Sequence, residues 1–389
     1  MDFLETREHA ILRKSVSDFM TEFSDDYFRE QDRKEEFPRE LWNKIAAQGW
    51  FGVNVPEKYD GSEFGIYEAS VLAHQIAASG AGITGGNLFN IVSMMTVQPI
   101  VDHGSERLKS KYLPELASGK LIPCLGLTEP NAGVNTFNLE TFAVKESDSY
   151  IIHGHKMWTT LAHVADIMII VARTTPKEKV QRKSDGLSLF VAELNKPLVK
   201  IQRISKMPMR ALGSNEVFLN NLQVPEENLL GVKDKGWETL LTLLNAERVA
   251  TAAMCIGTGE LVLRKSTEYA KQRIVFDRPI GQNQGIQFPL ANCKIELESA
   301  KLMTQKAGWL FDKTRNCAFE ANMAAYLGAQ AAFNAADRAI QTLGGMGFAR
   351  DTDIERHWRD VRLFRTAPIP EEMTLNYVGQ HVLNLPRSY

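Results

Sequence analysis

The spacing of apolar residues divides the chain into three parts. Over residues 1–122, apolar positions recur at three- and four-residue steps, which predicts helices joined by short loops. Over residues 123–233 they form short β-branched and aromatic runs between turn residues, which predicts strands. Over residues 234–389 the helical spacing returns. No helix of crossover length separates the strands, so we expect an α+β multidomain fold: an N-terminal all-α domain, a central antiparallel β-domain and a C-terminal four-helix bundle.

Local signals place several elements within these parts. Helices are predicted at residues 66–78, ended by Ser79 and Gly80; after Pro38, ended by Gly49; and after the cap Ser105, where Pro114 is expected to interrupt the helix. Strands are predicted at 150–155, 165–172, 186–193 and 217–224, and long helices at 236–273, 284–313 and 318–343. We expect the rest of the chain to be arranged around the helix at 236–273.

Glu247 and Arg248 interrupt the apolar pattern of that helix. A glutamate on a helix is usually solvated, because ionised carboxylates are seldom fully buried. Here the neighbours one turn away include Leu243 and Ala250, so Glu247 is expected to lie against an apolar surface. Such surroundings raise the pKa of a carboxyl group towards neutrality, which suits a general base. Glu247 is therefore a candidate catalytic residue.

Composition excludes several classes of protein. The 389 residues, 44% apolar and 24% charged, are typical of an ordinary globular chain of two or three domains. Forty-five basic and 47 acidic residues leave a net charge of −2, so no nucleic acid partner is expected. The four cysteines are dispersed without a CxxC pair, and no metal site is predicted. With neither a signal segment nor an apolar run of membrane-spanning length, we expect no membrane partner and a reducing, cytoplasmic location.

Two stretches could contact a cofactor, although the two commonest nucleotide-binding loops, GxGxxG after a strand and GxxxxGK[ST], are absent. The turn-rich loop at 128–133 (TEPNAG) is expected to lie beside a strand and can present backbone N–H groups to an anion. Trp158 stands at a strand end beside two threonines. A tryptophan in that position is more often part of the core than a cofactor platform, so both interpretations remain open.

Six stretches in order resemble the acyl-CoA dehydrogenase family, and the resemblance covers nearly the whole chain. They are residues 127–133 (LTEPNAG), 156–160 (KMWTT), 209–231, 273–288, 341–347 (QTLGGMG) and 355–362 (ERHWRDVR). The resemblance implies a homotetrameric flavoprotein with FAD between the β-domain and the bundle, and small residues at 250–259 would let helices pack closely in such an assembly.

The resemblance also implies residue roles. Leu127, Thr128, Gly133 and Val134 would line the flavin and its pyrophosphate, and Trp158 and Thr160 would flank the isoalloxazine ring. Arg273, Phe276, Gln284, Gln341 and Gly345 would reach the pyrophosphate and adenine side from a partner subunit. Val134 stands where a serine near the acyl-CoA is usual, so a hydroxyl group is missing from the substrate side.

The segment that usually carries the family's base departs from the pattern. Most members have Y-E-G-T near the C-terminus, whereas an ungapped comparison puts Pro368 at the base position and Pro370 at the threonine. Glu371 or Glu372 would serve as the base only if the loop were shifted by about three residues. A proline can neither abstract a proton nor donate a backbone hydrogen bond. A minority of members carry the base on a helix in an E-R pair, which Glu247 and Arg248 match. Arg248 is then expected to contact the CoA part of the substrate or a neighbouring carboxylate, and not to pair with Glu247, because adjacent residues on a helix do not face the same way.

The implied reaction is FAD-dependent α,β-dehydrogenation of an acyl-CoA thioester. A carboxylate removes the α-proton, the β-hydrogen leaves as hydride to flavin N5, and a trans-2-enoyl-CoA forms. Electron-transferring flavoprotein is the implied electron acceptor. Two alternatives remain open: a flavin oxidase or hydroxylase of the same fold, and a non-catalytic homologue that binds FAD and acyl-CoA.

Overall fold

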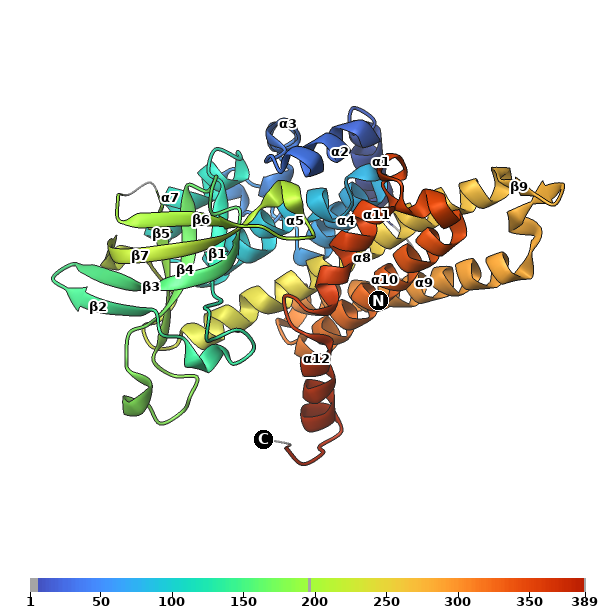
Figure 1. The fold of residues 1–389 in the computed structure, drawn as a ribbon. Coiled ribbons are helices and arrows are strands. Elements are labelled where there is room, and N and C mark those ends of the chain that lie inside the picture. Colours follow the sequence, from blue (N-terminus) through green and yellow to red (C-terminus); the bar gives the residue numbers. More distant parts are fainter. Residues whose placement is uncertain (1–5, 195–196, 388–389) are drawn as a thin grey trace.

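The computed structural model describes residues 6–194 and 197–387 and has three parts in chain order. A helical N-terminal part is followed by a β-sheet, at the left in Figure 1, and by long helices that extend away from the sheet to the right. This order confirms the predicted α+β class, in which helical parts precede and follow the β-sheet along the chain.

The N-terminal part consists of helices with recognisable caps. They are α1 (Arg7–Met20), α2 (Asp25–Lys34), α3 (Arg39–Ala47), α4 (Ile66–Ile76), α5 (Gly82–Val92), α6 (Gln98–His103) and α7 (Glu106–Ala117). Pro38 precedes α3, and Gly49 follows it with φ 72°, as predicted. The Ser105 side chain accepts a hydrogen bond from the Leu108 N–H and caps α7. Pro114 lies inside α7 without interrupting it, so that prediction was wrong: the helix continues for three more residues after the proline.

The helix predicted at 66–78 is observed as α4 and the π-helical turn η3 (Ala77–Ala81), and it is broken by a kink at Gly80, where its end was predicted. Gly80 has φ 129°, a non-helical angle that glycine adopts without a Cβ clash. Helix α5 begins directly beyond this kink. A second π-helical turn, η4 (Ser93–Val97), joins α5 to α6. Single π-helical turns of this kind are often found at functional sites.

The sheet has the strand order β6-β7-β3-β2-β4-β5-β8, and β1 pairs with β4. The strands are β1 (Pro123–Gly126), β2 (Phe142–Glu146), β3 (Ser149–Thr160), β4 (Ile167–Arg173), β5 (Leu187–Glu193), β6 (Val199–Ile204), β7 (Ser214–Pro225) and β8 (Leu229–Leu230). The pairing is antiparallel as expected, except that β1 and one residue of β2 pair with β4 in parallel. The chain passes from β1 directly into the loop at 127–134. The parallel pairing of β1 with β4 therefore fixes the position of the predicted cofactor loop relative to the sheet.

The C-terminal part is built on three long helices. They are α8 (Gly236–Gln272), α9 (Gln284–Thr314) and α10 (Ala318–Leu343), followed by α11 (Ile354–Arg362) and α12 (Glu371–Tyr377). The small two-stranded hairpin of β9 (Ile274–Val275) and β10 (Arg278–Pro279) joins α8 to α9. The small residues at 250–259 pack inside the same chain: a Cβ at Gly257 would lie 2.3 Å from the His74 carbonyl oxygen of α4. That run therefore does not itself mark a contact between subunits.

Helix α8 is long and apolar enough, by length and composition alone, to span a membrane. However, 83% of its most apolar window is buried inside the fold. The expectation that no run approaches a membrane span was thus too strict, and the burial is that of a core helix of a globular protein.

Candidate functional site

Glu247 lies in the first half of α8 and is buried, with only 7% of its surface exposed. Leu243 and Ala250, one turn to either side, are fully buried. Burial raises the pKa of the Glu247 carboxyl group to about 7, and the positive charge of Arg248 opposes this rise. Within the described part of the chain, no hydrogen bond or ion pair reaches this carboxylate. The carboxylate is thus able to accept a proton from a ligand at neutral pH.

Arg248 does not pair with Glu247. Its Nη1 donates to Asn245 Oδ1 at 2.9 Å, on the preceding turn of α8. Its Nε is buried and has no partner among residues 6–194 and 197–387. Burial lowers the pKa of Arg248, although the nearby Glu247 charge raises it. The guanidinium group therefore retains a donor for a group outside the described chain.

The C-terminal segment reaches α8 one turn beyond Glu247. Pro368 and Glu371 line a small pocket of about 10 Å³ together with Thr251. Both oxygens of Glu371 are held by Arg365, at 2.7 and 2.9 Å, and Glu372 is exposed. Neither glutamate has the free, buried carboxylate that Glu247 provides, and Pro368 has no acid–base group.

A buried ion pair fixes the loop at 127–134 against the end of β3. Lys156 is fully buried, and its Nζ donates to Glu129 Oε1 at 2.7 Å and to the Leu127 carbonyl oxygen at 3.1 Å. The Met157 N–H donates to the Thr128 carbonyl oxygen at 2.8 Å. Burial lowers the pKa of Lys156 to about 8, with Glu129 opposing the change. The ion pair of Lys156 with Glu129 was not predicted from the sequence, where its only signal was a charged residue within each of the two motifs.

The outer side of this loop and strand end is open to solvent. Trp158 follows Met157 at an irregularity of the β3–β7 pairing, with φ 60° and 51% of its surface exposed. Leu127, Thr128 and Thr160 are half-buried, while Gly133 and Val134 are exposed. A Cβ at Gly133 would meet nothing within 4 Å, so the backbone there is open to a ligand. A flat exposed ring beside an open, rigidly held loop fits the flavin cofactor that the resemblance implies.

The remaining predicted cofactor residues lie elsewhere. Phe276, with 93% of its surface exposed, and the exposed Arg273 are at the β9–β10 hairpin. In Figure 1 this hairpin is at the end of the long helices farthest from the sheet. Gln284 is exposed at the start of α9, and Gln341 and Gly345 are exposed around the end of α10. One chain therefore does not bring Arg273 and Phe276 to Trp158.

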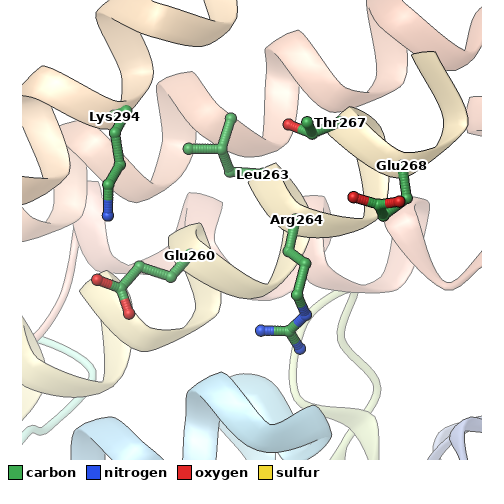
Figure 2. Close-up of a pocket in the computed structure, with 6 residues that line it drawn as sticks. All are labelled: Glu260, Leu263, Arg264, Thr267, Glu268 and Lys294. Carbon is green, nitrogen blue, oxygen red and sulfur yellow. The ribbon is translucent and has the colours of Figure 1, made fainter. Parts of the chain in front are cut away.

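A recess of about 310 Å³ between α8 and α9 is separate from this site (Figure 2). Charged residues dominate its lining of Glu260, Leu263, Arg264, Thr267, Glu268 and Lys294. Arg264 donates to the Ala78 carbonyl oxygen, and Glu260 lies 3.0 Å from His74 and 3.5 Å from Lys301. Glu260 is 13 residues beyond Glu247, roughly 20 Å along the helix axis. The recess is not part of the candidate site, because Glu260, Glu268 and Lys294 are ion-paired within the chain and Arg264 is held by a backbone carbonyl oxygen.

Comparison with protein families gives matches along almost the entire chain. The acyl-CoA dehydrogenase N-terminal domain matches residues 6–120, the middle domain matches residues 124–222, and the C-terminal domain matches residues 234–383.

Individual relatives match at full length. The chain is 34% identical to an acyl-CoA dehydrogenase of Mycobacterium tuberculosis over 395 residues, covering 100% of this chain and 99% of the relative. A glutaryl-coenzyme A dehydrogenase in complex with glutaryl-CoA superposes with a TM-score of 0.95 at 28% identity, covering 100% of this chain and 98% of that one. The prolyl acyl carrier protein oxidase AnaB superposes with a TM-score of 0.92 at 28% identity, covering 97% of this chain and 100% of that one.

Proposed function

The chain belongs to the acyl-CoA dehydrogenase family, and we propose that it converts an acyl-CoA thioester to a trans-2-enoyl-CoA with Glu247 as the base. The observation that carries this proposal is the buried, unpaired Glu247 carboxylate, whose pKa is raised to about 7. In the ungapped comparison, the other position at which the family carries its base falls on Pro368, which lines a pocket together with Thr251 of α8.

FAD is the cofactor of this proposed reaction and, when bound, supplies the acceptor for the β-hydrogen, which leaves as hydride to N5. Within one chain we assign Leu127, Thr128, Gly133 and Val134 to the flavin and pyrophosphate, and Trp158 and Thr160 to the two sides of the ring system. The exposure of Trp158 and the open backbone at Gly133 support this assignment. Glu247 takes the α-proton, and Arg248 and Val134 contact the CoA thioester.

We further propose a homotetramer in which Arg273, Phe276, Gln284, Gln341 and Gly345 complete the cofactor site of a partner subunit. The exposed apolar residues of α9 support a contact between helices of different subunits: Phe288, Ile295, Leu302 and Trp309 recur at seven-residue intervals and all remain exposed. A seven-residue apolar repeat is the pattern of a helix that packs along another helix. Figure 1 shows the β9–β10 hairpin at the end of the long helices farthest from the sheet, so its residues cannot reach the loop at 127–134 of the same chain; this supports a site shared between subunits.

Three further proposals follow from family membership. The electrons pass to electron-transferring flavoprotein. The domains are residues 1–122, 123–233 and 234–389, which the ranges of the matched family models support. The location is cytoplasmic, in agreement with four cysteines that are all free and buried.

The direct test is anaerobic titration of the purified, FAD-loaded protein with a panel of straight, branched and aromatic acyl-CoA thioesters. At least one thioester should bleach the oxidised flavin absorbance and yield the matching 2-enoyl-CoA. Binding of FAD and thioesters without bleaching by any of them would indicate a non-catalytic homologue instead.

A flavin oxidase is the second candidate, because the fold and length also match a carrier-protein oxidase. The two candidates differ in how the reduced protein reacts with oxygen. A dehydrogenase, once reduced by substrate, should be reoxidised slowly by O₂ and rapidly by an electron-transfer protein or artificial acceptor. Rapid reoxidation by O₂ with stoichiometric H₂O₂ would favour the oxidase.

A further inference from the structure

Buried polar residues occupy every third position along α5 and η4. They are Thr84, Asn87, Asn90, Ser93 and Thr96, each with at most 7% of its surface exposed. A helix that is buried on all sides normally carries apolar side chains. Each buried polar group destabilises the fold unless it is hydrogen-bonded. The polar side chains of this stripe therefore require hydrogen-bond partners.

Hydrogen bonds within the chain satisfy the stripe incompletely. Asn90 Nδ2 donates to Asn87 Oδ1 at 3.2 Å and to the Met95 sulfur at 3.8 Å. Asn87 Nδ2 donates to the Met209 sulfur at 3.7 Å. Thioether sulfur is a weak acceptor. Among the described residues, Asn90 Oδ1 and Ser93 Oγ have no partner, although both residues are almost completely buried.

The contacts of α5 and α6 with α8 locate these atoms relative to Glu247. A Cβ at Gly82 would lie 3.7 Å from Thr258 Cγ2, and a Cβ at Gly86 would lie 2.5 Å from Met254 Cβ. Further along, His103 Nε2 is 3.1 Å from Thr242 Oγ1. From the first of these contacts to the last, the residue number rises along α5 and α6 and falls along α8. The segment from α5 to α6 therefore runs antiparallel to α8.

This register puts the unpaired atoms opposite the turn of α8 that carries Glu247. Asn90 follows Gly86 by four residues, so both lie on the face of α5 towards α8. Glu247 precedes Met254 by seven residues, so it lies on the face of α8 towards α5. The two facing helices thus present the free carboxylate of Glu247, Asn90 Oδ1 and Ser93 Oγ within the same layer.

We infer that the thioester preferred by this chain carries a hydroxyl beyond its β-carbon, which Asn90 and Ser93 receive in the layer between α5–η4 and α8. The inference rests on the proposed function, in which Glu247 faces the α-carbon. A hydroxyl group can donate to Asn90 Oδ1 and accept from the Ser93 hydroxyl, so it satisfies both unpaired atoms. A methyl group of the same size would leave both atoms unpaired, which disfavours the plain acyl chain.

Met95 gives the acyl group a way to enter. It lies in the π-helical turn η4, is only half-buried, and makes the weak sulfur contact with Asn90. An unbranched thioether side chain repacks easily. When the Met95 side chain is displaced, Asn90 Nδ2 loses a weak sulfur acceptor and can donate to the oxygen of the substrate hydroxyl instead.

The test compares thioesters that differ only by a hydroxyl in place of a methyl group. The pairs are 4-hydroxybutanoyl-CoA with pentanoyl-CoA, and 5-hydroxypentanoyl-CoA with hexanoyl-CoA. Anaerobic flavin reduction by the FAD-loaded full chain should favour the hydroxylated member of at least one pair by ~10-fold or more in kcat/KM. Asn90→Leu, which is close in size, should abolish or reverse this ratio, and Ser93→Ala should reduce it. Thr96→Val is the matched control: the Thr96 hydroxyl already donates to the Ile91 carbonyl oxygen, so the ratio should be unchanged.

Binding separates this inference from the proposed reaction. Calorimetric titration of Glu247→Gln with the same pairs measures affinity without turnover. Tighter binding of the hydroxylated thioesters with no flavin reduction in the unaltered protein would support the subsite and contradict the dehydrogenation. Flavin reduction without a preference in the unaltered protein, or with the same ratio in Asn90→Leu, would overturn the inference and leave the dehydrogenation intact. The unpaired atoms would then be the binding site of a structural water only.

Discussion

Burial gives Glu247 its acid–base character. With the pKa of the carboxyl group raised to about 7, the fraction ready to accept a proton changes across the physiological pH range. The rate constant of flavin reduction at saturating substrate should therefore rise with pH and level off above about 7, because only the ionised carboxylate can act as base. Anaerobic stopped-flow measurements from pH 5.5 to 9 check this, and a rate that falls over that range would contradict the role of Glu247.

The same burial links the stability of the fold to pH. The folded-state pKa of Glu247, about 7, lies above its ordinary value of 4.5. The contribution of the protonated carboxyl group to the free energy of unfolding is complete below pH 4.5 and is lost as pH rises through 7. The isosteric Glu247→Gln variant does not ionise, so above pH 7 it should be more stable than the unaltered protein, by on the order of 3 kcal/mol. Urea unfolding at pH 4.5 and pH 9 measures the difference, and Glu372→Gln, at an exposed position, should show none.

At the scale of elements, the Lys156–Glu129 pair joins the cofactor loop to β3. In Lys156→Met the buried Glu129 carboxylate loses its cation, which commonly destabilises a protein by about 3–5 kcal/mol. The Leu127 carbonyl oxygen also loses a donor. We expect a lower melting temperature and faster FAD dissociation, measured by fluorescence of the released flavin. Lys145→Met breaks a half-exposed pair with Glu226 on the same sheet and should change neither quantity appreciably.

Long periodic elements could be predicted from the sequence almost to the residue. The helices expected at 236–273 and 318–343 are observed as α8 (Gly236–Gln272) and α10 (Ala318–Leu343), because a sustained apolar face needs a helix to bury it. Strand β2 was missed because it is short and mostly exposed, so it shows little apolar alternation. Gly80 was predicted to end the helix at 66–78 and is observed as a kink with φ 129°, whereas the π-helical hydrogen bonding of Ala77–Ala81 has no signal in the sequence.

The candidate site was predictable only where a motif marked it. Glu247 was predicted because a charged residue interrupts an apolar helix and because Glu247 and Arg248 match the E-R pair of the family. The burial of Glu247 confirms the expected apolar environment. The roles assigned to it and to the cofactor residues remain predictions. Asn90 and Ser93 were not singled out, because their spacing matches no motif and they pack towards α8, which begins more than 140 residues later in the chain.

At the scale of the whole molecule, the apolar residues of α9 should hold the assembly together. Ile295→Glu places a charge at the centre of the exposed seven-residue repeat and should convert the proposed tetramer to smaller species, measured by multi-angle light scattering. FAD should be lost at the same time, because Arg273 and Phe276 would no longer reach a partner's site. Ile11→Glu is the matched control: Ile11 on α1 is 56% exposed, against 64% for Ile295, and belongs to no such repeat. A monomer that retains FAD and full activity would contradict the shared site.

The central claim is that a carboxylate on α8 removes the α-proton, and single-turnover flavin reduction tests it most directly. FAD-loaded Glu247→Gln and Glu371→Gln are each mixed anaerobically with one good acyl-CoA substrate. Glu247→Gln should keep its FAD and bind the thioester, yet reduce flavin slower by ~10²–10⁴-fold or more, because the amide cannot accept the proton. Glu371→Gln should remain within several-fold of the unaltered rate, since the Glu371 carboxylate is engaged by Arg365. Near-normal reduction by Glu247→Gln, with loss of reduction in Glu371→Gln, would place the base on the C-terminal segment and contradict the account.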